Sequence, residues 1–555
     1  MSNYNNARES LSNFLNISLK YLTYILYVKK IENLYTTFKI PKKNGGCREI
    51  NAPQNELKMI QKKLVFFLEE KMKDKFKTIN ISHGFVKERN IITNAKIHKN
   101  KKIVLNLDLK DFFDSFHFGR IKGFFEKNKD FKFSPELATL IAQLACYNGK
   151  LPQGAPSSPL ITNLICNIFD IRVLNLARKY KLNYSRYADD LTFSTNYKGF
   201  IKNLEEFKED ILLEIKKNGF EANMKKYRLT FQNSRQEVTG LTVNKKINVS
   251  KIYYKNTRAM AYSLYKNGEF KIDGIKDGTI NQLEGRFSFI NQLDIYNNFE
   301  KNRTKKEKGK KDGIKSWNIY NSREKEYQKF LFYKYFFMNQ KPLIVTEGKT
   351  DILYIKAALK NLYNDYPSLI IKEENKFIFK VSFLKRTKLL KYYLNLALDG
   401  ADTIMNIYNH FVDAYSSFYN YNDYFKKLTK KQAFNPVVLI FDNEIETEKP
   451  LKKFLAHAFP KSREINEKKD IIKKNCKLNI IDNLYLLTIN LVDDMKECEI
   501  EDLFIKDIHE RFSFNKDNPD KNKFSKNILK NYKNIDFSNF KPFLNNLASI
   551  LKEYN

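Results

Sequence analysis

The feature that most constrains this 555-residue chain is a pair of adjacent aspartates inside a strand-like segment. Asp189 and Asp190 interrupt the sequence SRYADDLTFS, which predicts a β-hairpin, and Asp108 closes the apolar, strand-like run KIVLNLD. Like charges within a few ångströms repel each other, and a desolvated carboxylate is costly unless a cation lies beside it. The sequence therefore predicts a fold in which two strand ends meet around divalent cations.

Magnesium suits such a group of carboxylates, because Mg²⁺ prefers oxygen ligands and substrate phosphates. Two such ions, roughly 4 Å apart, stabilise both the attacking and the leaving oxygen of an in-line phosphoryl displacement. Between the two acidic segments lies LPQGAPSSPLITN, where Gly154 and its neighbouring prolines indicate a turn. From that turn Gln153 and Ser157 can face a template and an incoming nucleotide. The chemistry predicted is nucleotidyl transfer.

The charge of the chain predicts a polyanionic partner. Lys and Arg number 99 against 63 acidic residues, a formal net charge of +36. A genome that favours lysine and asparagine is the alternative explanation. The five cysteines form no CxxC pair, so we expect neither a disulfide framework nor a zinc site. The N-terminus has no signal-like h-region and no window reaches 18 apolar residues, so we expect a cytoplasmic protein without a membrane segment.

The motifs over about residues 30–295 resemble those of reverse transcriptases. The segment IPKKNGGCREINAP is similar to the fingers segment that grips a triphosphate, which makes Lys42, Lys43 and Arg48 candidate nucleotide contacts; a solvated basic hairpin is the alternative. The resemblance implies a right-hand fingers, palm and thumb polymerase that uses deoxynucleoside triphosphates. It also implies that the three aspartates described above are catalytic and hold two Mg²⁺ ions.

Two further nucleotide-binding residues follow from the same resemblance. Phe113 falls where these polymerases place an aromatic side chain against a ribose 2'-hydroxyl, although it also reads as an ordinary core phenylalanine. Lys226, in GFEANMKKYRLT, fits the pattern just after the catalytic hairpin; plain surface charge is the alternative.

Two short strings resemble the signatures of bacterial retron reverse transcriptases. ITNAKIHKN carries Asn94 and His98 of an NAxxH pattern, and RQEVTGLTVN carries the triplet Val238, Thr239 and Gly240. We interpret these residues as RNA-binding. The resemblance implies that the template is the enzyme's own non-coding RNA and that priming occurs from a guanosine 2'-hydroxyl. The product it implies is msDNA, a branched single-stranded DNA joined to RNA.

A thumb is expected immediately after this triplet. The segment KIYYKNTRAMAYSLYKNGEF interleaves tyrosines with cations, including Tyr254, Lys255 and Arg258. Aromatic rings stack on bases and cations bind phosphates, so these three are candidate RNA contacts. An amphipathic helix with packed tyrosines is the alternative.

A second set of acidic residues lies in the C-terminal half. Glu347 ends the strand-like run PLIVTE and Asp351 opens a predicted helix, where an acid also suits the helix dipole. Asp442 and Glu444 follow the run VVLIFD and project to the same side if the segment is extended. Oxygen ligands of this kind predict a second cation site.

This arrangement resembles the TOPRIM domain of topoisomerases, primases and OLD-type nucleases. The resemblance implies that Glu347 is catalytic and that Glu347, Asp442 and Glu444 hold one or two Mg²⁺ ions. Two departures are the glutamate at 444 where an aspartate is usual and the long spacing of the acids; we expect LNLALDGADTI near Gly400 to supply the middle strand and glycine turn. Glu501 adds a ligand or lies on a solvated helix terminus.

The complete chain thus resembles a retron reverse transcriptase fused to a TOPRIM domain, an α/β multidomain architecture. It implies an antiphage role in abortive infection, in which the product restrains a nuclease-like effector that acts on DNA or RNA. A group II intron-type enzyme and a nucleic-acid-binding antitoxin or scaffold are the alternatives, and a homo-oligomer is compatible with each. The domains expected are fingers and palm (1–240), thumb (241–297), charged linker and connecting helix (298–340), TOPRIM domain (341–505) and C-terminal helical extension (506–555).

Overall fold

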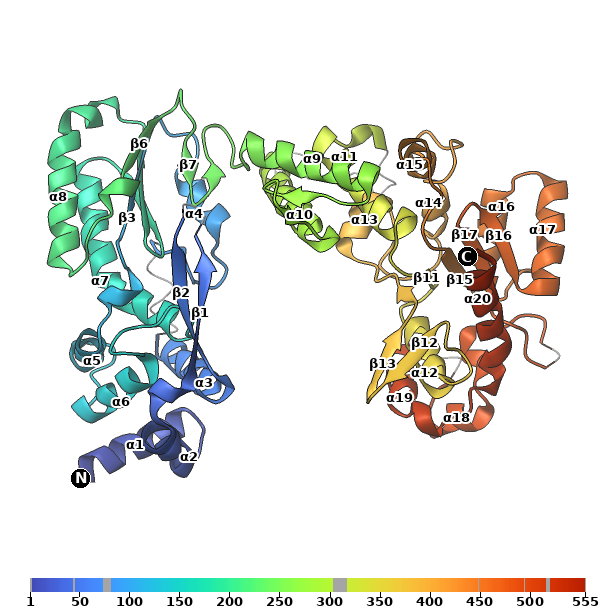
Figure 1. Ribbon diagram of the computed structural model, residues 1–555, viewed down its shortest axis with the longest axis horizontal. Helices are drawn as coiled ribbons and strands as arrows, with labels where there is room; N and C mark the ends of the chain where they lie inside the picture. The colour runs from blue at the N-terminus through green and yellow to red at the C-terminus, as the bar shows by residue number, and fades with distance from the viewer. Residues whose placement is uncertain are drawn as a thin grey trace. The chain divides into compact units, whose positions relative to one another are not determined.

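The computed structural model describes residues 2–42, 45–72, 81–302, 317–447, 449–493, 495–515 and 520–554. Their contacts divide the chain into two units. Unit 1 comprises residues 1–251 and 293–300, and unit 2 comprises residues 252–292 and 301–555. Each unit has its own sheet and its own core, so each is described by itself (Figure 1).

Unit 1 is built on a four-stranded antiparallel sheet in the order β4-β5-β3-β6. The strands are β4 (Asn183–Tyr187), β5 (Asp190–Thr195), β3 (Ile103–Asp108) and β6 (Arg228–Phe231). Leu105 and Leu107 alternate along β3 and enter the core on one face. The helices that bury this face are α7 (Ser158–Lys179) and α8 (Leu204–Lys217), which lie together beside the sheet in Figure 1.

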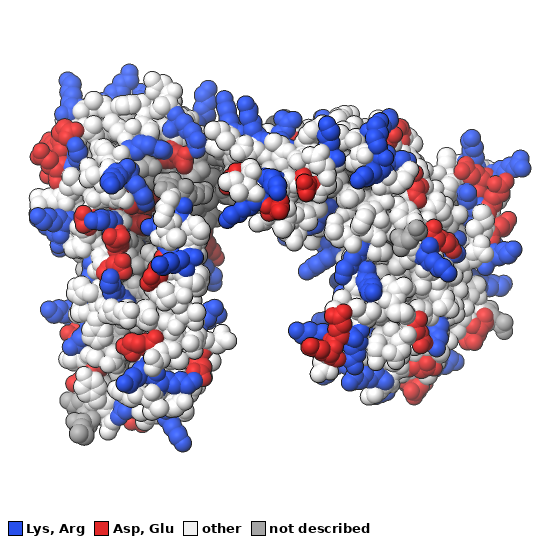
Figure 2. Space-filling view, viewed as in Figure 1, with Lys and Arg blue, Asp and Glu red and all other residues white. Residues whose placement is uncertain are grey.

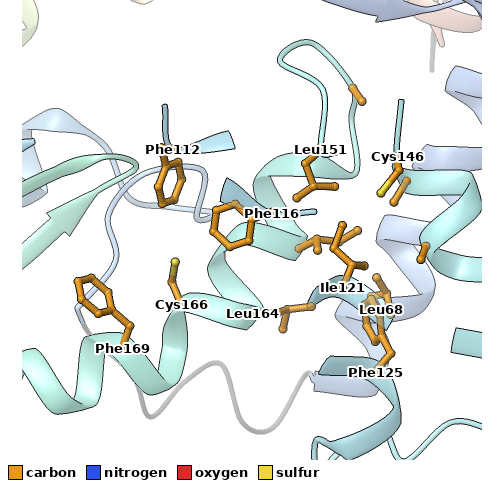
Figure 3. Packing of buried hydrophobic residues seen from close by; sticks show 14 of the residues in the cluster. Leu68, Phe112, Phe116, Ile121, Phe125, Cys146, Leu151, Leu164, Cys166 and Phe169 are labelled. Atoms are coloured by element: carbon orange, nitrogen blue, oxygen red, sulfur yellow. The ribbon is translucent and has the colours of Figure 1, made fainter. Parts of the chain in front are cut away.

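The core of unit 1 extends from the sheet to a group of aromatic and aliphatic side chains (Figure 3). Phe112 and Phe116 meet edge to face with ring centroids 5.1 Å apart. Against them lie Leu164, Cys166 and Phe169 of α7. Such buried aromatic contacts fix the loop that follows β3 and its last residue, Asp108.

The remaining elements of unit 1 surround this core. An antiparallel hairpin of β1 (Tyr35–Pro41) and β2 (Cys47–Pro53) is separate from the four-stranded sheet and projects exposed side chains. The others are α1 (Ser2–Phe14), α2 (Leu19–Thr23), α3 (Asn55–Met72), α4 (Ile91–Ile97), α5 (Phe118–Lys127), α6 (Pro135–Ala145), β7 (Glu237–Val238) and β8 (Leu241–Thr242).

Unit 2 contains a five-stranded sheet in the order β14-β11-β15-β17-β16. The first four strands are parallel, and β16 is antiparallel at the edge. Side chains of β15 alternate between two cores: Leu439 faces one and Val438 the other. A parallel sheet covered on both faces explains why its strands read as uninterrupted apolar runs. The strands are β11 (Leu343–Val345), β14 (Ser382–Phe383), β15 (Val437–Phe441), β16 (Lys477–Ile481) and β17 (Leu484–Thr488).

Helices cover both faces of this sheet. On one face, α12 (Asp351–Asn361) packs with α19 (Lys521–Lys530) and α20 (Lys541–Tyr554). On the other face lie α11 (Ser322–Phe332), α13 (Lys388–Leu394), α15 (Tyr421–Thr429), α16 (Pro450–Ala458) and α17 (Ser462–Asn475). The remaining elements are α9 (Lys251–Asn267), β9 (Lys271–Ile272), β10 (Lys276–Asp277), α10 (Ile280–Asn302), β12 (Ile370–Glu373), β13 (Lys376–Phe379), α14 (Met405–Tyr408) and α18 (Lys506–Arg511).

The helices of the predicted thumb share a core with the C-terminal half. Leu264 of α9 and Phe287 of α10 belong to the same buried cluster as Phe330 of α11 and Leu439 of the sheet. Tyr333 donates a hydrogen bond to the Leu264 carbonyl at 3.0 Å. The predicted linker is partly outside the described residues, and a packed helix, α11, lies in the C-terminal part of the range for which a connecting helix was expected. The domain boundaries proposed from the sequence stay a prediction.

No strand forms near Gly400, where the sequence predicted the middle strand of the second sheet, so that prediction was wrong. The parallel strand next to β11 on its outer side is β14. Gly400 does take the positive φ of +79° that a glycine turn requires. Among the described residues, α7 is the one helix long and apolar enough to cross a membrane, and half of its apolar window is buried within unit 1.

Candidate functional site

The three predicted palm aspartates converge at one end of the β3–β5 pair. Asp108 is the last residue of β3 and lies directly opposite Asp190, the first residue of β5. The backbone N–H of Leu109 donates to the Asp189 carbonyl at 2.9 Å. The tight turn of the β4–β5 hairpin, with Ala188 at φ +56°, thereby sets both aspartates of the pair beside the end of β3.

The electrostatics of this end of the sheet are those of crowded carboxylates with one strong counter-charge. Lys226 Nζ lies 2.7 Å from Asp108 Oδ2, and Asn223 Nδ2 donates to Asp108 Oδ1 at 3.2 Å. Desolvation, and then repulsion from Asp108, raises the pKa of Asp189. Desolvation followed by the charges of Asp189 and Asp108 raises the pKa of Asp190 to about 7. The positive charge near the cluster therefore does not balance its three carboxylates.

The donor chemistry of the cluster fits Mg²⁺, because all three side chains offer carboxylate oxygens. As the side chains lie, no three His, Cys, Asp or Glu residues in the described ranges are arranged to hold a metal ion. Part of the reason is Lys226, whose ammonium group already bonds one carboxylate oxygen of Asp108. A cation entering between the strands would compete with that ammonium for the same oxygen.

A buried ion pair holds the β4–β5 hairpin, and sequence reasoning missed it. Arg186, with no exposed side-chain surface, bonds Asp170 of α7 through Nε and Nη2, each at 2.8 Å. Its Nη1 donates to the Ala188 carbonyl at 3.0 Å, and its Nη2 also reaches Asn163 Oδ1 at 3.1 Å. Arg186 lies three positions before Asp189 in SRYADD and could have been noticed, because a cation within a buried strand must find an acidic partner.

Gly84 supports the same turn from outside. Asn163 Nδ2 donates to the Gly84 carbonyl at 2.9 Å. A Cβ at position 84 would lie 2.6 Å from the backbone nitrogen of Ala188, closer than real contacts allow. The absence of a side chain at Gly84 thus lets the chain approach the turn that carries Asp189.

The predicted nucleotide-binding residues lie on several elements around this site. Arg48, on exposed β2, is close enough to lower the pKa of Asp189, opposing its rise. Lys42 is exposed at the tip of the β1–β2 hairpin, whereas Lys43 lies outside the described residues. The Gln153 carbonyl accepts from Asn51 N–H at 2.8 Å, which joins the LPQG turn to β2. Phe113 is half-buried, with its ring 5.5 Å from that of Phe112.

Asn94 and His98 are not placed to contact RNA, and their interpretation as RNA-binding residues was wrong. Both are fully buried. His98 Nδ1 lies 2.7 Å from Ser194 Oγ, and its Nε2 lies 2.8 Å from Ser185 Oγ, which in turn donates to Asn94 Oδ1 at 2.6 Å. Burial lowers the pKa of His98 to about 3, with smaller effects of His83 and Lys101. The NAxxH pattern joins the helix after Asn90 to β4 and β5.

The VTG triplet forms a tight hairpin turn between β7 and β8. Val238 is fully buried, which rules out an RNA contact for its side chain in this structure. Thr239 and Gly240 have φ angles of +46° and +81°, the left-handed values that a two-residue hairpin turn requires. Gly240 is exposed, and the RNA contact proposed for these two residues stays a prediction.

The predicted thumb contacts lie on α9. Lys255 and Arg258 are exposed, and Tyr254 is half-buried. The guanidinium groups of Arg258 and Arg323 lie 5.9 and 4.8 Å from the ring centroid of Tyr254. The packed-tyrosine alternative holds for Tyr265, which is buried in the unit 2 core.

The second acidic cluster lies at the carboxyl ends of two adjacent parallel strands. Glu347 follows β11 and Asp442 follows β15, and these strands pair from Leu343–Val437 to Val345–Leu439. The Asp442 N–H donates to Glu347 Oε1 at 3.1 Å. Ligands of open α/β sheets commonly bind at this end of the strands.

The neighbouring acids crowd this pair. Asp351, nearly buried at the start of α12, accepts from Gly348 N–H at 2.7 Å, and desolvation raises its pKa to about 7. Desolvation also raises the pKa of Glu347, to which repulsion by Asp351 and Glu444 contributes. The pKa of Asp442 is raised by desolvation and then by Glu347. Glu444 is buried and its Oε1 lies 2.5 Å from Lys449 Nζ.

Two further residues complete this cluster. Glu501 is 1% exposed and not on a solvated face; Lys521 lies 3.2 Å from it. It lines a cavity of about 260 Å³ together with Glu444 and Glu499.

Arg386, which sequence reasoning did not identify, donates to the carbonyls of Glu347 (3.0 Å), Thr346 and Gly400, and so ties the predicted glycine turn to the end of β11. No motif in its surroundings signals this role.

Comparison with known proteins identifies the first unit. The family model "Reverse transcriptase (RNA-dependent DNA polymerase)" matches residues 40–243. Retron Mx65 reverse transcriptase of Myxococcus xanthus is 34% identical over 41% of this chain, and the chain spans 55% of that protein's length. Among solved structures, apo telomerase from Candida tropicalis matches with a TM-score of 0.29 and 12% sequence identity. The match covers 54% of this chain and 60% of the telomerase chain.

A third relative covers more of its own length. Retron Ec86 reverse transcriptase of Escherichia coli is 30% identical over 292 residues, which are 52% of this chain and 85% of that protein. The matched family model contains the β3, β4 and β5 strands that bring the three aspartates together. The chain belongs to the retron reverse transcriptase family.

Proposed function

We propose that the chain is an RNA-directed DNA polymerase that copies its own non-coding RNA into msDNA. The observation that carries this proposal is the register of β3 and β5, which sets Asp108 against Asp190 and leaves Asp189 in the adjoining turn. Three carboxylates at one end of the β3–β5 pair suit the metal-assisted transfer of a nucleotide to a growing strand.

Residues around the cluster have separate roles in this proposal. Asp108, Asp189 and Asp190 would hold Mg²⁺, which when bound neutralises the charge that develops on the transferring phosphate. Arg48 would bind the triphosphate of the incoming deoxynucleotide, because it lies within electrostatic reach of Asp189. Phe113 would lie against the sugar and exclude a 2'-hydroxyl. Lys226 would release Asp108 and pair with phosphate oxygens instead.

The nucleic acid that copurifies with the protein tests this proposal. Sequencing it should recover a single-stranded DNA joined to one structured RNA through a 2'-5' branch. A gene for such an RNA should lie beside the protein's own gene, whereas a group II intron-type enzyme should lie within a ribozyme. Heterogeneous cellular RNA without attached DNA would contradict the proposal.

A second function is favoured by the acids at the ends of β11 and β15. A TOPRIM-like nuclease is supported by the contact of Asp442 N–H with Glu347 Oε1 and by the nearby Glu444. Glu347 would act as general acid or base on a phosphodiester, a role for which its raised pKa is suited. The aspartate and glutamates would hold Mg²⁺, and in infection this effector would arrest growth.

Cleavage by the purified full-length protein tests the second function. With Mg²⁺, the wild type should cut DNA or RNA once its own msDNA is removed, and Glu347→Gln should not. Glu373→Gln, which removes an exposed acid from the same unit, serves as the control. Equal activity of Glu347→Gln would reduce the second unit to a binding module, as the antitoxin or scaffold alternative requires.

A further inference from the structure

Unit 2 carries a group of lysines held over aromatic rings, away from the acids described above. We call it the lysine–aromatic surface. It is formed by α12, by the β12–β13 hairpin, by edge strand β14 and by the turn after α19. Its members are Lys356, Lys360, Tyr363, Lys372, Phe377, Phe379, Phe383 and Tyr532.

Each of the three lysines touches two rings. Lys356 Nζ lies 4.9 Å from the Phe383 centroid and 5.9 Å from that of Phe379. Lys360 lies 5.8 Å from Phe377 and 5.5 Å from Tyr532. Lys372 lies 5.4 Å from Tyr363 and 5.7 Å from Phe377. Phe377 is shared by Lys360 and Lys372, and Lys356 joins them because it lies one helical turn from Lys360 on α12.

The lysines of this surface have no acidic counterpart. In the part of the chain that the structure describes, none of the three makes an ion pair with a carboxylate, although many other lysines do. Lys356 and Lys360 are one helical turn apart, where like charges destabilise a helix. Desolvation, and then repulsion by Lys360, lowers the pKa of Lys356. A polyanion would relieve this repulsion.

The framework beneath the surface is rigid. Leu359 of α12 and Ile370 of β12 are fully buried in the same core. Lys372 and Phe377 are directly opposite each other across the hairpin, and Phe379 shares the face of Phe377. Figure 2 shows basic side chains beside a group of acidic ones on the part of unit 2 where Figure 1 draws β12 and β13, and Glu373 and Glu374 of this hairpin are exposed. Ligand contacts would therefore need little reordering.

We infer that this surface binds single-stranded DNA. Cations that contact phosphates, interleaved with rings on which bases stack, are the combination that single-strand-binding proteins use. A duplex hides its base faces, so it cannot use the rings. DNA is the strand favoured because the proposed polymerase of the same chain would supply it at high local concentration; in this respect the inference rests on the proposed function.

Binding to the full-length protein tests the inference without requiring polymerase activity. The probe is a labelled oligothymidylate of about 12 nucleotides, a length that single-strand sites accommodate. Binding should weaken at least about tenfold in the triple variant Lys356→Gln/Lys360→Gln/Lys372→Gln. The plot of log association constant against log salt concentration should also become shallower by about 2, because each of the three lost phosphate contacts accounts for a slope of about 0.7. Phe377→Leu should weaken binding about fivefold or more.

The matched control is Lys453→Gln/Lys461→Gln/Lys474→Gln, which removes the same charge from exposed positions on α16, α17 and the loop between them. It should change binding less than about twofold. Equal losses in the two triple variants, or none in the first, would overturn the inference. Tighter binding of oligouridylate or of duplex DNA would also overturn it.

Photocrosslinking makes the result independent of how the variants fold. An oligonucleotide that carries 5-iodouracil should crosslink to Tyr363, Phe377 or Tyr532 of the wild-type protein. Crosslinks confined to unit 1 would overturn the inference. Primer extension on an RNA template, measured with the same preparations, separates this result from the proposed function: DNA binding without polymerase activity would contradict only the latter.

Discussion

The two acidic clusters differ in what opposes their negative charge. In unit 1, a lysine side chain bonds Asp108 directly and Arg48 lies within electrostatic reach of Asp189. In unit 2, Lys449 and Lys521 bond the outer acids, Arg386 lies within electrostatic reach of Glu347, and Glu347 meets Asp442 through a backbone N–H. The chain thus partly neutralises both clusters, but a lysine bonds an acid of the first directly, whereas among the described residues no lysine or arginine side chain forms an ion pair with Glu347 or Asp442.

The clusters also differ in how they are held. The β4–β5 turn depends on one buried network around Arg186, with Gly84 packed behind it. Glu347 and Asp442 instead follow two strands buried on both faces of a parallel sheet. A single substitution in the network should therefore disturb the first site, whereas the second is supported by many apolar contacts.

Asp189→Asn should have the largest effect and should separate the clusters. It removes a negative charge without changing side-chain size, so DNA synthesis should fall at least about a thousandfold, in line with several kcal/mol of lost transition-state stabilisation. Primer extension on RNA with Mg²⁺ measures it. Any cleavage by unit 2 should be unchanged. Undiminished DNA synthesis would refute the assignment of the palm aspartates.

Arg186→Met should destabilise unit 1 by about 3–5 kcal/mol, because it leaves Asp170 buried without a partner. Denaturant unfolding measures this loss, and adding Asp170→Asn should restore part of it. The control is Lys179→Met, which breaks an exposed ion pair with Asp210 and should cost less than about 1 kcal/mol. Similar costs for the two variants would argue against the buried network.

Gly84→Ala should lower DNA synthesis by about a hundredfold and leave most of the fold intact. The added methyl group would lie 2.6 Å from Ala188 N and push the hairpin turn, and a displacement of about 1 Å at a reacting group has this scale of effect. Gly123→Ala on α5 is the control, because its Cβ would meet open space. Normal activity of Gly84→Ala would mean that the turn tolerates the shift.

The contribution of His98 to the stability of unit 1 should fall as the pH falls below about 6.5, whereas Asp190, with its pKa raised to about 7, contributes in the opposite direction over the same range. Burial keeps His98 neutral in the folded state, with a pKa of about 3, so the unfolded chain binds more protons between these values. At pH 5 the loss is about 2 kcal/mol. Hydrogen exchange of β4 and β5 at several pH values, compared between the wild type and His98→Gln, measures this contribution because Asp190 is common to both proteins. An unchanged slope would contradict a neutral buried His98.

The elements that carry the site were predictable, but several roles were not. The apolar runs that end at Asp108 and Asp442 become β3 and β15, and YADD becomes a turn, because strand periodicity and turn residues are local signals. The burial of His98 depends on Ser185 and Ser194, more than 80 positions away, so its short motif could not reveal a structural role. Nor could spacing reveal Arg386, whose partners are backbone carbonyls.

The most direct measurement is a crossed assay of two full-length variants, Asp189→Asn and Glu347→Gln, each tested for RNA-templated DNA synthesis and for Mg²⁺-dependent strand cleavage. If each cluster serves its own reaction, the first variant loses synthesis and keeps cleavage, and the second shows the reverse. Loss of both reactions in either folded variant, or retention of both, would contradict the account.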